Sequence, residues 1–475
     1  MHDPKIARAF PLLLAAMLAG CTVGPNFMPP VPILPPVWQG AAPAAPPAST
    51  DGRWWRSFDD PVLDALEVHA GSDSLDIAAA IERITAARIE GGQARAASAP
   101  QVEGQAGYSR ERVGTAGIAS AAQTLLGVAP TTTPPKGVDF DLYSVGVGAS
   151  WELDLWGGHR RQVEAAQASV AATEAAARGV RLSVEAEVAR AYFQLRGLWE
   201  ERRIAQDRVG LAERNAAIAR ALLDRGLATA IDLSAAEEKL RALRGDIVEL
   251  DHQAAITQRA LAILVGATPD AVPFDRRTLV PPKPLPAIAA RLPSEVARTR
   301  PDIVEAEARL HATTAQIGVA QADFYPKISL TGLFDIDVLN LSDFGWNARN
   351  TSIGPSLSLP IFSGGRLQRQ LDLRRSQDRS AAIAYRQTVL NAWREVDDAL
   401  TATRAATERT CLSDRDLASR RQTVVVVEAR YARGDIGALP LLDARQAVLS
   451  AELSVVRQRV AASLARIQLH RALGG

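Results

Sequence analysis

Two very long helical segments constrain this chain more than any other feature of its sequence. One runs from Gly158 to Gly226 and the other from Gly365 to Gly434, so they hold about 68 and 69 residues and each spans ~100 Å at a rise of about 1.5 Å per residue. The core of an ordinary domain cannot cover such a helix. The first helix carries an apolar stripe with heptad spacing, which is typical of a coiled-coil seam. The stripe consists of Val170, Ala177, Val184, Ala191, Leu198, Ala205, Ala212 and Ala219.

Shorter helices complete the expected packing. The segment returning from Gly226 to Gly266 holds about 40 residues and the segment at about 62–98 holds about 35, so the two laid end to end match one long helix. We therefore expect each long helix to pair antiparallel with two stacked short ones, in a cylinder-like wall ~100 Å tall. Helix propensity alone would explain the many alanines but not the sustained heptad.

The sequence contains two copies of one pattern of elements. The stretch "ASWELDLWGGHRRQ" resembles "LSLPIFSGGRLQRQ", and the glycine pairs Gly157-Gly158 and Gly364-Gly365 mark the same point in each copy. Each copy is expected to contain a helix, a strand, a loop, a strand, a long helix, a tight turn and a helix. The glycine pairs are interpreted as the joints where a strand passes into a long helix.

The copies set the domain boundaries. We assign a first repeat to residues 61–270, a linker to 271–292 and a second repeat to 293–475. The long helices are expected at ~158–225 and ~365–433. Four strands are expected at ~101–110, ~142–155, ~327–337 and ~351–362.

The expected strands alternate between apolar and polar residues, so each has two unlike faces. Strands of this length cross a bilayer when tilted, with one face toward lipid and the other toward water. Four strands cannot close a barrel, which needs about eight, so several chains would have to pool them. On this interpretation Trp151 and Trp156 lie near one boundary of the membrane, while Glu152 and Asp154 face the water-filled lumen. The alternative is a soluble four-stranded sheet capped by helices, which leaves the long helices unexplained.

The N-terminus is typical of a bacterial lipoprotein. Residues 1–20 combine a short basic region with an apolar one, and "LAGC" ends at Cys21, which we expect to become a diacylglycerol-modified, N-acylated N-terminus. An ordinary secretory signal with an incidental cysteine is the alternative. Residues 21–60 form a proline-rich lipid tether and N-terminal segment. With Cys21 acylated, Cys411 has no partner for an intramolecular disulfide.

Charge and motif content exclude other functions. With 54 Lys+Arg against 53 Asp+Glu, no global field favours nucleic acid. The six histidines are scattered, with no HExxH motif and no Cys/His cluster, so we predict no metal site, no cofactor apart from the covalent lipid, and no enzyme activity. The acidic pair Asp59-Asp60 has no partner motif and is interpreted as solvated.

Several motifs together resemble one known family. They are "RWWRSFDDPVLDAL", "SWELDLWGGHRRQ", "RPDIVEAEARLHATTAQIGVAQADFYPKISLTG", "GPSLSLPIFSGGR" and "YARGDIGALPLLDARQ". The chain resembles TolC-family outer-membrane efflux proteins, and within them the NodT/OprM-like lipoprotein branch, over nearly the whole mature chain. The resemblance implies a mainly α fold with a membrane β-barrel part. Three chains would close one 12-stranded barrel, which continues as a long α-helical periplasmic tunnel.

The resemblance also implies a function and partners. It predicts a homotrimeric, lipid-anchored exit duct in the bacterial outer membrane that extends into the periplasm. The duct would passively conduct small molecules from an inner-membrane pump of the RND type and a periplasmic membrane-fusion adaptor. The alternative is a periplasmic coiled-coil scaffold or adaptor lipoprotein without a pore.

Site residues follow from the resemblance. It places the periplasmic aperture at Arg430, Tyr431, Leu439 and Asp443, and the adaptor-docking turns at Gly226 and Gly434. A ring of three Asp443 carboxylates would favour cations and hold arginine partners in a closed state. The alternative is that Asp443 and Arg430 are solvated charges at helix ends and that the glycines only serve the turns.

Overall fold

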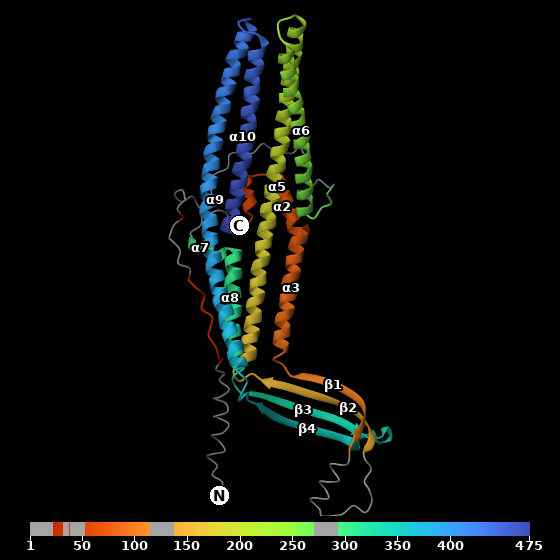
Figure 1. Ribbon diagram of the computed structural model, residues 1–475. Coiled ribbons are helices and arrows are strands. Elements are labelled where there is room, and N and C mark those ends of the chain that lie inside the picture. The colour runs from red at the N-terminus through yellow and green to blue at the C-terminus, as the bar shows by residue number, and fades with distance from the viewer. Residues whose placement is uncertain (1–21, 32–37, 39–52, 115–136, 270–292) are drawn as a thin grey trace, which may run out of the picture. The chain divides into compact units, whose positions relative to one another are not determined.

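The computed structural model describes residues 22–31, 38, 53–114, 137–269 and 293–475, and is mainly helical with one sheet (Figure 1). The chain divides into two compact units. The sheet unit comprises Met1–Pro29, Ala87–Val170 and Arg309–Ala381, and the helical unit comprises Pro30–Ala86, Ala171–Ala308 and Ala382–Gly475. Each unit contains segments of both sequence repeats, so the boundaries at 61–270 and 293–475 do not mark compact bodies. Among the described residues, no helix has a stretch both long enough and apolar enough to cross a membrane.

Four antiparallel strands form one sheet in the order β1-β2-β3-β4. They are β1 Gln101–Val113, β2 Val138–Leu153, β3 Lys327–Val338 and β4 Arg349–Ser358 (Figure 1). Strands β1 and β4 are the two edges of this sheet. Each carries backbone N–H and C=O groups on its outer side that no neighbouring strand of the sheet pairs.

Strand β4 ends earlier than the expected ~351–362. It stops at Ser358, and the residues up to the glycine pair are not in a strand. Pro360 explains the difference, because it has no N–H to donate to a ladder. Strand β2 also ends two residues early, at Leu153, where the amide of Leu155 turns back to the carbonyl of Leu153 at 2.9 Å.

The helices follow the expected order. They are α2 Pro61–Asp73, α3 Leu75–Ala96, α5 Gly158–Asp224, α6 Ala230–Leu264, α7 Pro293–Thr299, α8 Pro301–Ala322, α9 Arg366–Ala432 and α10 Ala438–Leu473, with a short 3-10 helix η1 at Trp54–Phe58. The long helices α5 and α9 each have 67 residues, and their bounds lie within one residue of those expected. Ion pairs hold each to its antiparallel partner: Arg244–Glu213 at 2.8 Å joins α6 to α5, and Arg421–Glu452 at 2.8 Å joins α9 to α10.

The single helix expected at about 62–98 is wrong in one respect. The chain breaks at Ser74, whose backbone is extended (φ −62°, ψ 124°), so that α2 and α3 are separate helices. The carbonyl of Asp73 lies so close to Gly266 that a Cβ on that glycine would overlap it. The residues that follow α6 thus pack against the break between α2 and α3. The sequence around Ser74 gives no sign of this contact.

The acidic pair Asp59-Asp60 was expected to be solvated, and this is wrong for Asp60. One of its oxygens accepts hydrogen bonds from the amides at the start of α2, which makes it the N-cap of that helix. The other accepts from the Tyr192 hydroxyl at 2.8 Å and from Arg196 at 2.6 Å, in a buried ion pair. Asp60 therefore joins η1 and α2 to α5.

A buried carboxyl group lies in the main core of the helical unit. This core packs Trp55 and Phe58 of η1 against α2, α5 and α6. Within α2, Glu67 is only 2% exposed, and neither carboxyl oxygen has a hydrogen-bond partner among the described residues. Burial, together with the smaller effect of the nearby carboxylates of Glu185 and Asp64, raises the pKa of Glu67 to about 9.

Glu67→Gln should remove part of the pH dependence of stability. Between its ordinary pKa of 4.5 and about 9, Glu67 stays protonated in the folded chain but ionises in the unfolded one. The free energy of unfolding should therefore fall as the pH rises through this window, by about 1.4 kcal/mol per pH unit. Thermal unfolding in detergent at pH 5, 7 and 9 measures this slope, which should be smaller in Glu67→Gln. The exposed Glu82→Gln is the control, and equal slopes in Glu67→Gln and wild type would contradict the assignment.

Candidate functional site: a two-faced sheet, its junctions and the helical turns

The strand register gives the sheet two chemically different faces. Directly opposed pairs such as Val102–Ala149, Val147–Phe334 and Leu330–Pro355 place apolar residues of all four strands on one face. On this face no charged residue lies between Tyr143 and Leu153 of β2, a band ~33 Å long along the strand and ~25 Å tall at the usual tilt of barrel strands. Val102 and Ile353 are 66% and 83% exposed there. Only lipid or another apolar surface would cover such a face well.

The opposite face is polar and acidic. It carries Ser, Thr, Asn and Gln from all four strands, although Leu142 and Leu333 also belong to it. Its charged residues are Glu103, Glu111, Glu152, Asp335, Asp337 and Lys327, a net charge of −4 from five acids and one base. Charges on the apolar face lie only toward the loop end of the sheet, as in the pairs Arg110–Asp141 and Arg112–Asp139. The polar face suits contact with water.

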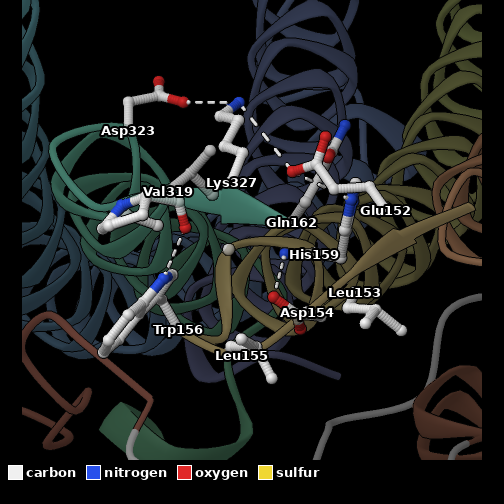
Figure 2. Close-up of a pocket in the computed structure, with 13 residues that line it drawn as sticks. Glu152, Leu153, Asp154, Leu155, Trp156, His159, Gln162, Val319, Asp323 and Lys327 are labelled. Carbon is white, nitrogen blue, oxygen red and sulfur yellow. Dashed lines mark hydrogen bonds and ion pairs between the residues drawn. The ribbon is translucent and has the colours of Figure 1, made fainter. Parts of the chain in front are cut away.

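The first strand-to-helix joint is held by the acid that precedes it. Gly157 has φ +79°, which favours glycine, and α5 begins at Gly158. The carboxylate of Asp154 accepts a hydrogen bond from the amide of His159 at 3.1 Å (Figure 2). It accepts a second one from the amide of Arg160 at 2.9 Å, and so caps α5. Asp154 was expected to face a lumen, but the structure uses it to connect strand and helix.

A cavity of about 130 Å³ lies beside this joint, between the end of β2, the start of α5 and the loop into β3 (Figure 2). Lys327 contacts Asp323 at 3.1 Å and Glu152 at 3.9 Å, and Glu152 lies 3.7 Å from His159. The charged side chains of the cavity thus pair with one another. Within the described part of the chain, no group of three metal-ligating side chains occurs. The ion pairs around the cavity hold the end of β2, the start of α5 and the start of β3 together.

The two tryptophans expected near a membrane boundary have different partners. Trp156 donates to the carbonyl of Pro326 at 2.8 Å and stacks on Tyr325 with ring centroids 4.8 Å apart. It therefore fastens the end of β2 to the start of β3. Trp151 lies on the apolar face, 38% exposed, and its indole N–H donates to the carbonyl of Ser98 at 3.0 Å. An exposed ring with a satisfied N–H is typical of a side chain at a membrane–water interface.

The second joint is built differently. Gly364 and Gly365 both have positive φ, +59° and +81°, before α9 begins at Arg366. Counting back from the glycines, Ile361 stands where the first copy has Asp154, so α9 lacks the acidic cap. Ile361 and Phe362 are 93% and 91% exposed. Two large apolar side chains so fully exposed side by side mark a surface for contact.

The two tight turns expected between long and short helices share one geometry. Gly226 and Gly434 have φ +73° and +79°. Across each turn an amide bonds back to the helix end: Leu227 to the carbonyl of Leu222 at 2.8 Å, and Asp435 to that of Arg430 at 3.0 Å. This is the Schellman arrangement, in which glycine supplies the left-handed residue. The structure shows why glycine stands there and leaves the adaptor-docking role a prediction.

The helices that follow the turns differ in their caps. Thr229 and Asp232 form a complete capping box at the start of α6. In α10 the N-cap is Gly437, without a side-chain hydrogen bond, and Pro440 stands where the first copy has Asp232. The α10 end of the second hairpin is therefore less strongly fixed by local contacts than the α6 end of the first.

The four residues assigned to an aperture lie on one hairpin. Arg430 and Tyr431 belong to the last turns of α9, while Leu439 and Asp443 belong to the first turns of α10. All four are exposed, and neither Arg430 nor Asp443 forms an ion pair with another described residue. The structure thus brings the four to one end of the helical unit and leaves them available to another copy or to solvent.

The first joint also contains a contact that the sequence did not predict. Residues 22–27 of the expected tether are packed onto it, and the buried side chain of Arg161 binds them. Comparison of the two copies gave no signal for it, because Arg369 stands at the matching position of α9: the amide of Arg161 bonds to the carbonyl of Gly157, and the amide of Arg369 to that of Gly365. The remainder of the tether at 32–37 and 39–52 lies outside the described residues.

Comparisons with known proteins agree with one another. The chain matches the family described as "Outer membrane efflux protein" over residues 69–267 and 292–475. It is 33% identical to outer membrane protein OprJ of Pseudomonas aeruginosa over 472 residues, which cover 98% of this chain and 95% of that protein. Its fold is similar to the solved outer-membrane channel OprN, with TM-score 0.80, 30% identity, and coverage of 96% and 99%. The open state of the Neisseria gonorrhoeae MtrE outer membrane channel gives TM-score 0.79, 25% identity, and coverage of 96% and 98%.

The difference between the caps predicts different local stability at the two turns. Thr229→Ala should cost about 1 kcal/mol at the start of α6 and speed hydrogen exchange of its first amides about fivefold. Gly437→Ser should slow exchange at the start of α10, because the backbone there (φ −75°, ψ 178°) already suits a serine cap. Amide exchange followed by mass spectrometry measures both. If neither substitution changes the exchange of its own helix, the caps do not set the stability of these ends.

Proposed function

This chain belongs to the outer membrane efflux protein family and is an outer-membrane efflux channel, and we propose that it serves as the exit duct of a tripartite system. In that system a periplasmic adaptor and an inner-membrane pump, of the RND type, deliver cargo to the duct. The uncharged apolar band of the sheet, opposite an acidic polar face, is the observation that carries this function. A periplasmic scaffold without a pore has no use for such a band, and the channel relatives leave that alternative without support.

The duct needs more than one chain. One chain contributes four strands, whose edges β1 and β4 would each leave a row of backbone groups unpaired in lipid. Three copies give twelve strands, so that β4 of one copy pairs with β1 of the next and no edge remains. The polar faces then line the water-filled interior and the apolar faces meet lipid. We therefore propose a homotrimer with a closed 12-stranded barrel and a helical tunnel in the periplasm.

The periplasmic end of the tunnel would carry the aperture. Three copies of the α9–α10 hairpin would place three Asp443 carboxylates and three Arg430 guanidinium groups at one constriction. The weak cap of α10 supports movement of this hairpin in preference to α5–α6. The turns at Gly226 and Gly434 would meet the adaptor. The chain itself performs no catalysis, and the pump supplies both energy and most of the selection of cargo.

A lipid anchor at Cys21 completes the proposal. Cys21 lies outside the described residues, and the sequence before it is typical of a lipoprotein signal. Its diacylglycerol and N-acyl chains would insert into the outer membrane. The chain is then held there both by its barrel and by its anchor.

Purified protein should form pores in planar bilayers, and Asp443→Ala should alter them. Removing three carboxylates from the constriction should raise single-channel conductance and lower the preference for K⁺ over Cl⁻. Asp416→Ala removes an exposed acid of α9 that pairs with Arg420, and it should leave both quantities unchanged. Unaltered conductance and selectivity in Asp443→Ala would contradict the aperture assignment. Failure of the wild-type protein to form pores would contradict the duct.

Phe362→Ser should weaken the trimer. Phe362 follows edge strand β4 and is 91% exposed in one chain, so its burial against a second copy would contribute about 2 kcal/mol per interface. Native mass spectrometry over a dilution series in detergent measures the fraction of trimer. At the concentration at which half of the wild-type protein is trimeric, this fraction should be more than tenfold lower in Phe362→Ser. Phe362→Leu retains the apolar contact and serves as the control. If Phe362 faces lipid instead, neither substitution will change the assembly.

A further inference from the structure

The residues that directly follow Cys21 are bound in a groove of the sheet unit. The amide of Val23 donates to the carbonyl of Trp156 at 3.0 Å, at the first strand-to-helix joint. The backbone of Thr22 packs directly against Gly157, so that a side chain on that glycine would overlap it. The segment Thr22–Phe27 (TVGPNF) carries no charge, so it is bound through backbone hydrogen bonds, one amide side chain and shape.

Arg161 makes most of the hydrogen bonds to this segment. Its side chain is 5% exposed, and its guanidinium donates to the carbonyl oxygens of Val23 at 3.3 Å and Gly24 at 3.4 Å. It also donates to the side-chain oxygen of Asn26 at 2.7 Å. The planar fork of arginine can reach several acceptors at once, which a lysine cannot do in the same geometry. The fourth partner, Glu164 at 2.7 Å, balances the buried charge.

Close packing requires glycines on both sides of the contact. Gly24 has φ +95°, and a Cβ there would overlap the backbone of Gly318 on α8. A Cβ on Gly318 would in turn overlap the side chain of Arg161. The segment thus lies between the start of α5 and α8, which come from different sequence repeats. The segment can therefore bind here in only one backbone conformation.

An aromatic contact ends the groove. Phe27 stacks on His311 of α8, with ring centroids 4.4 Å apart and an interplanar angle of 12°. His311 in turn contacts Glu164 at 2.9 Å, and the same carboxylate pairs with Arg161. One network of three side chains therefore holds both ends of the six-residue segment.

We propose that this groove is the seat of the mature N-terminus and that Arg161 positions the lipid anchor at the first strand-to-helix joint. The inference rests on the proposed acylation of Cys21. One peptide bond links Cys21 to Thr22 and sets their Cα atoms about 3.8 Å apart. The acyl chains therefore enter the membrane beside Gly157 and not at the end of a free tether. The anchor then lies beside Gly157, four residues beyond Leu153, where the apolar band of β2 ends.

Protease release of the lipid tests the seat. In cells fed labelled palmitate, the label should enter Cys21 of the full-length protein. Chymotrypsin cleavage after Phe27 would then separate the labelled heptapeptide Cys21–Phe27 and its lipid from the rest of the chain. In membranes, Arg161→Met should release label about tenfold faster than wild type, because cleavage follows the population in which the segment has left its groove. Arg178→Met, an exposed arginine of the same helix, is the control and should behave as wild type.

A second variant and a second measurement separate the possible failures. Gly24→Ala disrupts the seat from the side of the segment and leaves the body of the chain unchanged, so it should also speed release even if Arg161→Met fails to fold. Amide exchange at Val23 should be protected in wild type and in unacylated Cys21→Ser, and unprotected in Arg161→Met. Release and exchange equal to wild type in both Arg161→Met and Gly24→Ala would overturn the seat. Absence of label from wild type, with Val23 still protected in Cys21→Ser, would instead refute acylation and with it the positioning of an anchor.

Discussion

Hydrogen bonding of the backbone in lipid is the constraint on which the rest of this structure depends. A sheet with an uncharged apolar band and two free edges is stable in a bilayer only if both edges find strands, because each unpaired group costs several kcal/mol there. The chain has four strands, and in the proposed trimer the missing partners come from other copies. Assembly is then a condition for membrane insertion, and the exposed Ile361 and Phe362 beside β4 fit the same requirement. The long helices continue from these strands through the glycine joints.

The sequence predicted the regular parts of the fold and few of its specific contacts. The bounds of α5 and α9 agree to within one residue, because heptads and glycines define them locally. The early end of β4 was readable in Pro360, whereas the break at Ser74 arises from a contact with the distant end of α6. Asp60 and Arg161 were missed for the same reason, since their partners lie more than a hundred positions away along the chain. Of the candidate site, the glycines lie at the joints and turns and the four aperture candidates lie on the α9–α10 hairpin, while their roles stay predictions.

The most informative positions are those at which the two copies differ. Asp154 caps α5 where Ile361 leaves α9 uncapped, and the Thr229 box fixes α6 where Gly437 leaves α10 without a side-chain cap. Arg161 is buried and binds the N-terminal segment, whereas Arg369, at the matching position of α9, is exposed. At these positions the first copy carries the stabilising contacts, and the second carries the exposed apolar pair and the less restrained hairpin. The two copies thus share the same order of helices and strands, and they differ in the side chains that cap and fasten the helix ends.

The equal lengths of α5 and α9, 67 residues each, limit how such a protein can change over time. A single inserted residue in one helix would rotate everything beyond it by about 100° and move the apolar stripe off its seam. It would also shift the turn at the end of that helix along the helix axis relative to the turn at the end of the other long helix. Length changes can survive only as whole heptads introduced into both copies together. Tunnels of this architecture should therefore vary in length by discrete steps, whereas their surface loops can change by any number of residues.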